Sequence, residues 1–304
     1  MAQWQTHTVA SDSTLAEDVI DQIYNIDPTE TPFTAMVKTG KANQPNHEWI
    51  TDNLEAVGAN AQIEGSDATY GDTNPAGRLD NRTQIFRKTF NVSETLQASR
   101  NYGLRNYVSY EAAKKAKELK RDIEYAFVGA GRQAKVVGDG SSTASKLQCA
   151  QAFIAAANTD ANGGVDRDLN EAQIMGIMER VYTAGGNPDC IMIHPSHALS
   201  IAAFATSGTG TSRDFAASKT YVNAVDVIRT PYGDVDVVLN RFMDSGSAMI
   251  LDKAYWSKDL LRPTKTEKLA KTGSSIKYMM ETELTLAALN PDASGLIDDL
   301  TPVV

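Results

Sequence analysis

Cysteine is scarce in this sequence, with only two in 304 residues, Cys149 and Cys190. No Cys-x-x-Cys pair is present, so the sequence indicates neither a disulfide framework nor a structural zinc motif of that spacing. We interpret both thiols as small buried side chains.

Long apolar runs are also missing. No stretch approaches the roughly 18 apolar residues of a membrane-spanning helix. The N-terminal residues have neither the basic leader nor the apolar block of a secretory signal. We therefore expect synthesis in the cytoplasm and no membrane partner.

Positive charge is in deficit, because the formal net charge is −9. Proteins that grip nucleic acid usually carry a basic excess, since neutralised phosphates supply much of the affinity. The charge balance argues against a dedicated DNA- or RNA-binding protein, but not against a wall that encloses DNA. The hydrophobic fraction of 42% and charged fraction of 22% are typical of a soluble globular chain with one large domain or two smaller ones.

The most informative stretch lies between residues 46 and 98. Apolar residues alternate with polar ones from Ile85 to Ala98, which predicts a half-buried β-strand. Trp49–Val57 is a weaker candidate for its partner strand. The connection from Gly58 to Asn81 is rich in Gly, Asn and Asp and too poor in large apolar side chains to form a core.

A connection of that length without its own core is uncommon inside a compact domain and is usually functional. We predict that it forms the tip of a long projecting hairpin that needs a neighbouring subunit to cover it. The side chains that we expect to make these inter-subunit contacts are Ile63, Tyr70, Arg78, Leu79 and Arg82.

One long amphipathic helix is predicted from Leu104 to Ala130. Its apolar stripe recurs at spacings of three and four residues, while charged residues, among them Glu124, fill the rest of the surface. Gly129 and Gly131 are well placed to end it.

The remaining pattern is mixed and shows no βαβ regularity, which indicates an α+β fold. Asp168–Glu171 resembles a capping box that opens a helix through about Ala184. Further predicted elements, in chain order, are a helical piece at 148–157, a strand at Cys190–Ile193, a helix at 195–204, a hairpin of strands 225–228 and 235–239, and strands at 248–251 and 276–286.

Few motifs point to chemistry. His194 and His197, three residues apart, could hold a metal if Asp189 or Cys190 supplied a third ligand, but helix-start chemistry accounts for the pattern better. Asn158–Gly163 imitates the start of a calcium loop, yet Leu169 stands where the bidentate Glu belongs. We therefore predict no metal, no cofactor and no enzymatic activity.

The order of these elements resembles a known family. A polar N-terminal arm and a glycine-rich hairpin precede a strand ending in Thr95-Leu96-Gln97-Ala98-Ser99-Arg100. A long helix and the turn Val137-Gly138-Asp139-Gly140 follow. The sequence is similar in this respect to the major capsid proteins of tailed bacteriophages with the Hong Kong 97-type fold, and more narrowly to the group typified by phage SU10.

The resemblance implies a division of the chain. It assigns residues 1–45 to an N-terminal arm and 46–98 to the extended β-hairpin loop. Residues 99–144 would form the peripheral domain with the long spine helix, 145–240 the axial domain, and 241–304 the return strands of the peripheral domain with the C-terminus.

The resemblance also implies partners. Copies would assemble into the pentamers and hexamers of an icosahedral head that encloses double-stranded DNA without reading its sequence, assembled in the host cytoplasm and then located in the virion. With only residues 1–45 ahead of the hairpin, a separate scaffolding protein is expected, together with a portal. A decoration protein is left open.

Some members of the family link subunits covalently through a lysine of the extended loop. Lys88 is the only lysine between Trp49 and Leu104, and it lies on the predicted strand rather than at the glycine-rich tip, so we predict no such crosslinks. Three alternatives remain: an encapsulin-type nanocompartment shell, a minor head protein, and a metal-dependent enzyme that uses His194 and His197.

Overall fold

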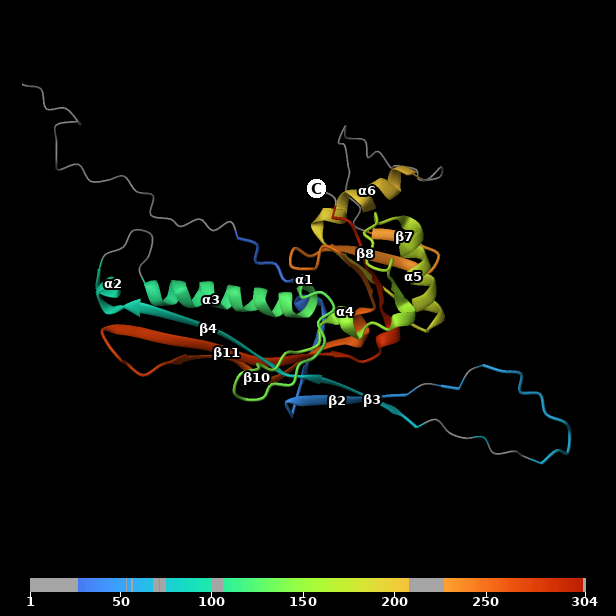
Figure 1. Ribbon diagram of the computed structural model, residues 1–304, viewed down its shortest axis with the longest axis horizontal. Coiled ribbons are helices and arrows are strands. Elements are labelled where there is room, and N and C mark those ends of the chain that lie inside the picture. The colour runs from blue at the N-terminus through green and yellow to red at the C-terminus, as the bar shows by residue number, and fades with distance from the viewer. Residues whose placement is uncertain are drawn as a thin grey trace, which may run out of the picture.

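A computed structural model of the chain describes residues 27–52, 54–55, 57–67, 71, 75–99, 106–207 and 227–302. The described strands form a four-stranded, a six-stranded and a two-stranded sheet. Figure 1 shows a long helix and its sheet on one side, a mixed α/β unit beside them, and a hairpin that projects from the body. This hairpin, residues 46–82, is called the finger below. No helix among the described residues is long and apolar enough to span a membrane.

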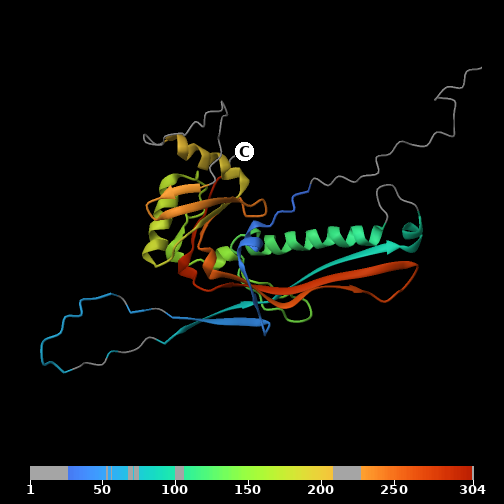
Figure 2. The same ribbon diagram turned by 180° about the vertical axis from the view of Figure 1, so that it is seen from behind.

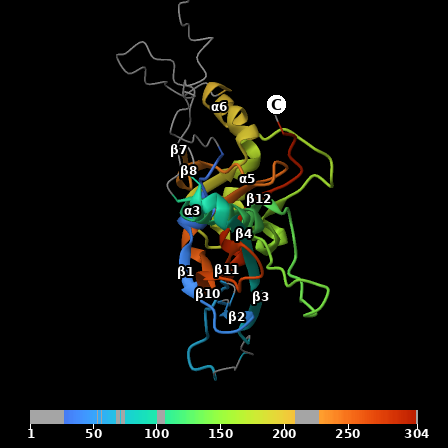
Figure 3. The ribbon, with the colours of Figure 1, turned by 90° about the vertical axis from the view of Figure 1, so that its left-hand side faces the viewer.

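The long layer consists of the four-stranded sheet with one helix over it, and Figure 3 views it nearly end-on. Its strand order is β1-β10-β11-β4, where β1 is parallel to β10 and the other neighbours are antiparallel. The elements are β1 (Lys38–Lys41), β4 (Gln84–Ser93), β10 (Trp256–Lys268), β11 (Ser275–Ala288) and the helix α3 (Tyr107–Glu124).

Strand β4 confirms the predicted alternation as far as Ser93. Phe86, Phe90 and Val92 are buried, and Lys88 on the same face pairs with Asp122 of α3 at 2.6 Å. The last part of the prediction is wrong, because the chain turns after Ser93 into a short helix, α2 (Glu94–Ala98).

The predicted hairpin pairing is also wrong. The partner of β4 is β11, while the strand around Trp49, β2 (Asn46–Thr51), pairs with β3 (Gly77–Arg82). The hairpin therefore ends at Arg82, and β4 belongs to the long sheet. Strands β3 and β4 are separated along the chain only by Thr83, yet they belong to different sheets. The period-two pattern cannot reveal this change of sheet.

Helix α3 follows the predicted stripe, since Leu119 and Ile123 are buried and Phe127 continues the same face. The side chain of Asn106 caps the helix by accepting a hydrogen bond from the N–H of Ser109 at 3.2 Å. A π-helical turn, Tyr125–Gly129, ends it within one residue of the prediction. Leu104, the predicted first residue, lies outside the described residues.

Gly129 does more than terminate this helix. A Cβ atom at this position would lie 2.2 Å from the carbonyl oxygen of Phe242, so the backbones approach too closely for any other residue. The contact joins the end of the long helix to the segment that follows strand β8 (Gly233–Leu239).

Glu124 was predicted to lie on the polar surface of the helix, and this is wrong. Its side chain is fully buried and accepts hydrogen bonds from the N–H groups of Phe33 and Thr34, both at 2.8 Å, and from the Thr34 hydroxyl. The amide of Asn240 donates a further bond at 2.6 Å. One carboxylate thus joins the first described helix, α1 (Pro32–Met36), to α3 and to the chain after β8.

The mixed unit is built on the six-stranded sheet, in the order β5-β12-β9-β6-β8-β7. Its two central strands are buried along their whole length, and the helix α5 packs against β9 and β12. The strands are β5 (Thr159–Asp160), β6 (Cys190–Ile193), β7 (Val227–Thr230), β8 (Gly233–Leu239), β9 (Ala248–Leu251) and β12 (Gly295–Ile297). The α-helices are α4 (Ala150–Phe153), α5 (Glu171–Thr183) and α6 (Ala198–Ser207), with 3-10 turns at Ala156–Asn158, Pro195–His197, Lys253–Tyr255 and Pro291–Ala293.

Most of these elements confirm the predicted order, including β6, β9 and the β7–β8 hairpin. The predicted capping box is displaced by two residues, because Asn170 and Gln173 form it instead of Asp168 and Glu171. Both pairs satisfy the spacing rule, and only the backbone of the preceding loop decides which one caps the helix.

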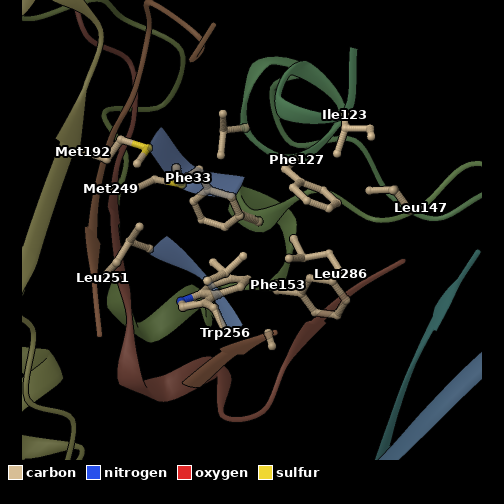
Figure 4. Close-up of a cluster of buried hydrophobic side chains, with 14 of the residues drawn as sticks. Phe33, Ile123, Phe127, Leu147, Phe153, Met192, Met249, Leu251, Trp256 and Leu286 are labelled. Carbon is tan, nitrogen blue, oxygen red and sulfur yellow. The ribbon is translucent and has the colours of Figure 1, made fainter. Parts of the chain in front are cut away.

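Among the residues that the structure describes, buried apolar side chains form two clusters. The larger joins α1, the end of α3 and the long sheet, with Phe33 lying edge-on to Phe127 and Trp256 at centroid distances of 5.9 Å (Figure 4). The second lies between α5 and the six-stranded sheet.

Candidate functional site

The projecting finger, residues 46–82, begins as a firmly attached stem. Strands β2 and β3 pair from Asn46–Arg82 to Thr51–Gly77. Because direct cross-strand partners share a face, Trp49 and Leu79 lie on the side of the stem that faces the body. The indole of Trp49 packs near Phe153 and donates a hydrogen bond to the carbonyl of Ala288 at 2.9 Å.

Polar contacts fix the base of the same stem. Asn81 is fully buried; its amide donates to the carbonyl of Leu286 at 2.6 Å and its carbonyl accepts from the N–H of Gln148 at 2.8 Å. His47 lies 2.9 Å from a carboxylate oxygen of Asp259. The finger therefore leaves the body in a defined direction rather than hanging from a loose hinge.

The distal part of the finger, residues 52–76, is different. All of its described residues are exposed. Large apolar side chains are among them: Leu54 is 98% exposed, Val57 104% and Ile63 82%, and Ile50 at the end of the stem is 73% exposed. Such a concentration of exposed apolar side chains on one projecting element marks an interaction surface.

Charge on this distal part has one sign. Residues 52–76 contain Asp52, Glu55, Glu64, Asp67 and Asp72 and no Lys, Arg or His. The finger thus presents apolar side chains on an acidic background.

The structure divides the five predicted contact residues. Ile63 lies in the distal part, whereas Arg78, Leu79 and Arg82 lie on β3 in the stem, which corrects their placement at the tip. Tyr70 lies outside the described residues. The prediction did not include Ile50, Leu54 and Val57, which are also exposed on the finger, although three apolar residues within a polar stretch could have signalled them.

Lys88, the candidate for covalent linkage, lies on β4 and not on the finger. Its ion pair with Asp122 holds the ammonium group against α3. This position agrees with the predicted location away from the tip.

The His194–His197 motif has a structural role at the start of a helical segment. The Nδ1 atom of His194 accepts a hydrogen bond from the N–H of Ser196 at 3.2 Å, and the Nε2 atom of His197 lies 2.7 Å from the carbonyl of Ser245. Burial, together with the nearby His197, lowers the pKa of His194. The described residues contain no group of three His, Cys, Asp or Glu side chains that could hold a metal.

The loop that imitates a calcium site is organised around an anion. The carboxylate of Asp299 accepts hydrogen bonds from the N–H groups of Asn162 at 2.7 Å and Gly164 at 2.9 Å. Arg167 forms an ion pair with Asp160 at 3.0 Å. Backbone donors that converge on one carboxylate are the opposite of the oxygen ligands that calcium requires.

This arrangement predicts a pH effect on the loop. The N–H groups of Gly164 and Asn162 favour the ionised carboxylate and hold the pKa of Asp299 below its usual value. Because the folded pKa is depressed, the stabilisation is present above the unfolded pKa of about 3.9 and is lost as the pH falls below it. The protection factors of the Asn162 and Gly164 amides, which correct for the slower intrinsic exchange in acid, should therefore fall as the pH drops below about 4 and through the depressed pKa of Asp299, and Asp299→Asn should show low protection already at neutral pH. Exchange in the Asp299→Asn variant that matches the unchanged chain at neutral pH would contradict the assignment.

Comparisons with known proteins give a consistent result. A family model described as SU10 major capsid protein matches residues 3–301. The major capsid protein of Escherichia phage Phieco32 is 31% identical over an alignment of 318 positions. The alignment covers 90% of this chain and 90% of that protein.

Solved structures with the same fold include shells of two kinds. The capsid of Cyanophage A-1(L) matches with a TM-score of 0.70 at 14% identity, covering 97% of this chain and all of that one. The SrpI encapsulin of Synechococcus elongatus matches with a TM-score of 0.61 at 10% identity, covering 99% and 98%. At these identities the structural matches show the fold alone.

Proposed function

This chain belongs to the SU10 major capsid protein family, and from that membership we propose that the finger of each subunit holds the next one in the shell. The chain is a phage major capsid protein, a component of the virion that builds an icosahedral capsid. The predicted family and the α+β, Hong Kong 97-type fold are confirmed. The contacts that join the copies are our proposal.

The single observation that carries this proposal is the contrast within the finger. The stem is tied to the body by Trp49 and Asn81, while Leu54, Val57 and Ile63 beyond it are exposed. Burying one such side chain stabilises a contact by about 1.5–3 kcal/mol. A rigid root that carries unburied apolar side chains suits a contact with another molecule.

The remaining predicted contact residues differ in exposure. Arg78 is exposed and pairs with Glu48 at 3.0 Å on the outer face of the stem, whereas Arg82 and Leu79 are partly buried. We include both arginines with Ile50 in the proposed inter-subunit surface, together with Tyr70 of the distal part and Leu79, which lies beside Trp49 on the inner face.

The rival functions have weaker support. The encapsulin shares the fold, but the family model and the curated relative are phage capsid proteins. The family is a structural one and not a class of enzymes. We propose that the chain catalyses no reaction, because His194 and His197 are occupied as helix-start residues.

Other parts of the assembly stay proposals. We propose pentamers and hexamers of this chain, a separate scaffolding protein and a portal. We also keep the predicted division into N-terminal arm, extended loop, peripheral domain and axial domain as a proposal. Strand β4 moves from the loop to the peripheral sheet, and β9 and β12, predicted among the peripheral return strands, move to the six-stranded sheet of the axial part. A net charge of −9 suits a wall that encloses DNA without binding it tightly.

Replacing Leu54, Val57 and Ile63 together by Ser tests the proposal. We expect unchanged unfolding of the isolated subunit, because these side chains are exposed in it, but at least a tenfold loss of shells in electron micrographs, because the contact loses several kcal/mol. Val165→Ser removes an apolar side chain of similar exposure, 63%, from another loop and should leave shell yield unchanged. Normal shell yield from the triple variant would refute the role of the finger.

A further inference from the structure

The exposed face of α3 carries three lysines that have no carboxylate partner in the described part of the chain. Lys114, Lys117 and Lys120 are exposed and recur every three residues, so they follow one another along the helix surface. Helix α3 makes two ion pairs with described residues, and neither involves any of the three. This lysine stripe is a strip of positive charge on a chain whose net charge is −9.

The start of the described chain lies on the same face of α3. Glu124, which holds α1, follows Lys120 by four residues and Lys117 by seven, and these spacings place all three on one side of a helix. Because Glu124 accepts hydrogen bonds from the N–H groups at the start of α1, the segment that leads into α1 is fixed at the end of the lysine stripe. Figures 1 and 2 show that segment, residues 27–31, over α3 on the side away from the sheet.

A further lysine adds positive charge at this place. The Nζ atom of Lys258 on β10 donates a hydrogen bond to the carbonyl of Thr34 at 2.9 Å. Burial is the main cause that lowers the pKa of Lys258; Glu124 opposes it, and Lys120 adds to it. Lys120 and Lys258 therefore repel each other, and another anion beside them would be stabilised.

The chain before residue 27 has the complementary charge. We call residues 1–26 the acidic arm, because they contain no Lys or Arg and four carboxylates: Asp12, Glu17, Asp18 and Asp21. An extended chain from Asp21 to Asp27 spans up to about 20 Å, whereas α3 rises only about 15 Å from Lys114 to its last residue. The carboxylates of the arm can therefore reach every lysine of the stripe.

The same face of α3 also offers apolar surface. Tyr110 and Ala113 precede Lys117 by seven and four residues, so they lie among the lysines, and the stems of the lysines are themselves apolar. The acidic arm carries apolar side chains four residues apart: Leu15, Val19 and Ile23. Docking on this face can thus cover apolar side chains as well as pair charges.

We propose that the acidic arm docks on the lysine stripe of its own subunit, with Asp18 and Asp21 facing Lys117 and Lys120. Docking within one molecule is favoured because α1 tethers the arm beside the stripe, which gives it an effective concentration on the order of 1 mM. The inference does not depend on the role proposed for the finger. DNA and separate acidic proteins have the same sign of charge, but the arm is the acidic group whose root the structure places on this face.

Disulfide trapping in the isolated full-length subunit is the first experiment. Gln22→Cys or Asn25→Cys is combined with Ala113→Cys on the lysine face, and the native Cys149 and Cys190 are buried. At least one pair should form an intramolecular disulfide about tenfold faster than the same arm cysteine combined with Ser141→Cys, which is exposed on another loop. The rate should not change on dilution. A rate that falls on dilution, or equal rates for the 113 and 141 positions at both arm cysteines, would overturn the inference.

Charge reversal tests the pairing itself. Lys117→Glu with Lys120→Glu should slow the disulfide at position 113 about fivefold at low ionic strength, as should Asp18→Lys with Asp21→Lys, because attraction becomes repulsion. All four changes in one chain should restore the rate to within about twofold. Lys265→Glu with Lys268→Glu makes the same charge change at the exposed end of β10 and should have no effect.

Acetylation of the native lysines gives an independent readout. Neutralising the arm with Glu17→Gln, Asp18→Asn and Asp21→Asn should raise the acetylation rates of Lys117 and Lys120 about threefold, since their ammonium groups lose their partners. The rates of Lys265 and Lys268 serve as the control within the same chain and should stay constant. Unchanged acetylation of the stripe would contradict the docking. A loss of shells on reversal of the stripe, with no change in the disulfide rate, would assign the lysines to another acidic partner and overturn the inference.

Discussion

A chain in which Asn-Gly replaces residues 52–76 should fold normally and form no shells. Thr51 and Gly77 are the last paired residues of the stem, and a two-residue Asn-Gly turn joins antiparallel strands at that separation. All described residues that are removed are exposed, so no core is lost. Shortening the loop from about 25 residues to two should even stabilise the subunit by up to about 2 kcal/mol.

Urea unfolding of the isolated variant and electron microscopy of its assembly measure the two halves of this expectation. A second variant that replaces residues 52–76 with a Gly-Ser linker of equal length separates reach from side-chain chemistry, and it should also fail to form shells. Loss of cooperative unfolding in the short variant would place the finger in the subunit's own core. Normal shells would show that the finger is dispensable.

Glu124→Ala should destabilise the subunit by about 3–5 kcal/mol, which is a large part of the stability of an ordinary domain. The substitution removes the acceptor for the N–H groups of Phe33 and Thr34 and for the amide of Asn240. Buried donors left without an acceptor each cost about 1–3 kcal/mol. We also expect faster proteolytic cleavage near Lys38, because α1 loses its attachment to α3.

Two controls define the size of this effect. Glu124→Gln keeps the volume and one oxygen but turns an amide N–H toward a donor, so it should cost about 1–2 kcal/mol. Glu118→Ala on the same helix removes a partly exposed pair with Lys115 and should cost less than about 1 kcal/mol. If chemical unfolding shows that Glu124→Ala lowers the free energy of unfolding no more than Glu118→Ala does, the role assigned to Glu124 is wrong.

Local patterns were sufficient for most of the fold. The apolar stripe of α3 and the alternation of β4 place a helix and a strand correctly, because one buried face repeats at a fixed period. The continuous apolar run Ala248–Leu251 places a strand that is buried on both faces. Strand β10 was missed. Its sequence has little alternation and includes Pro263, and the sheet has register shifts between Leu260 and Arg262 and between Arg262 and Lys265.

Contacts between residues far apart in the sequence determine the features that local patterns did not predict. Glu124 occupies a position on the helix that no periodicity marks as buried, and its donors come from residues 90 and 116 positions away in the chain. The pairing of β4 with β11 instead of β2 is of the same kind. The finger itself was predictable, because a long segment poor in apolar residues cannot form a core, but its stem was misplaced at the boundary with β4.

A cryo-EM reconstruction of the assembled shell tests the central claim most directly. We predict that residues 52–76 of each subunit lie across a neighbouring copy, with Leu54, Val57 and Ile63 buried in that contact. Fingers that fold back onto their own subunit, or that extend into solvent without touching another copy, would contradict it.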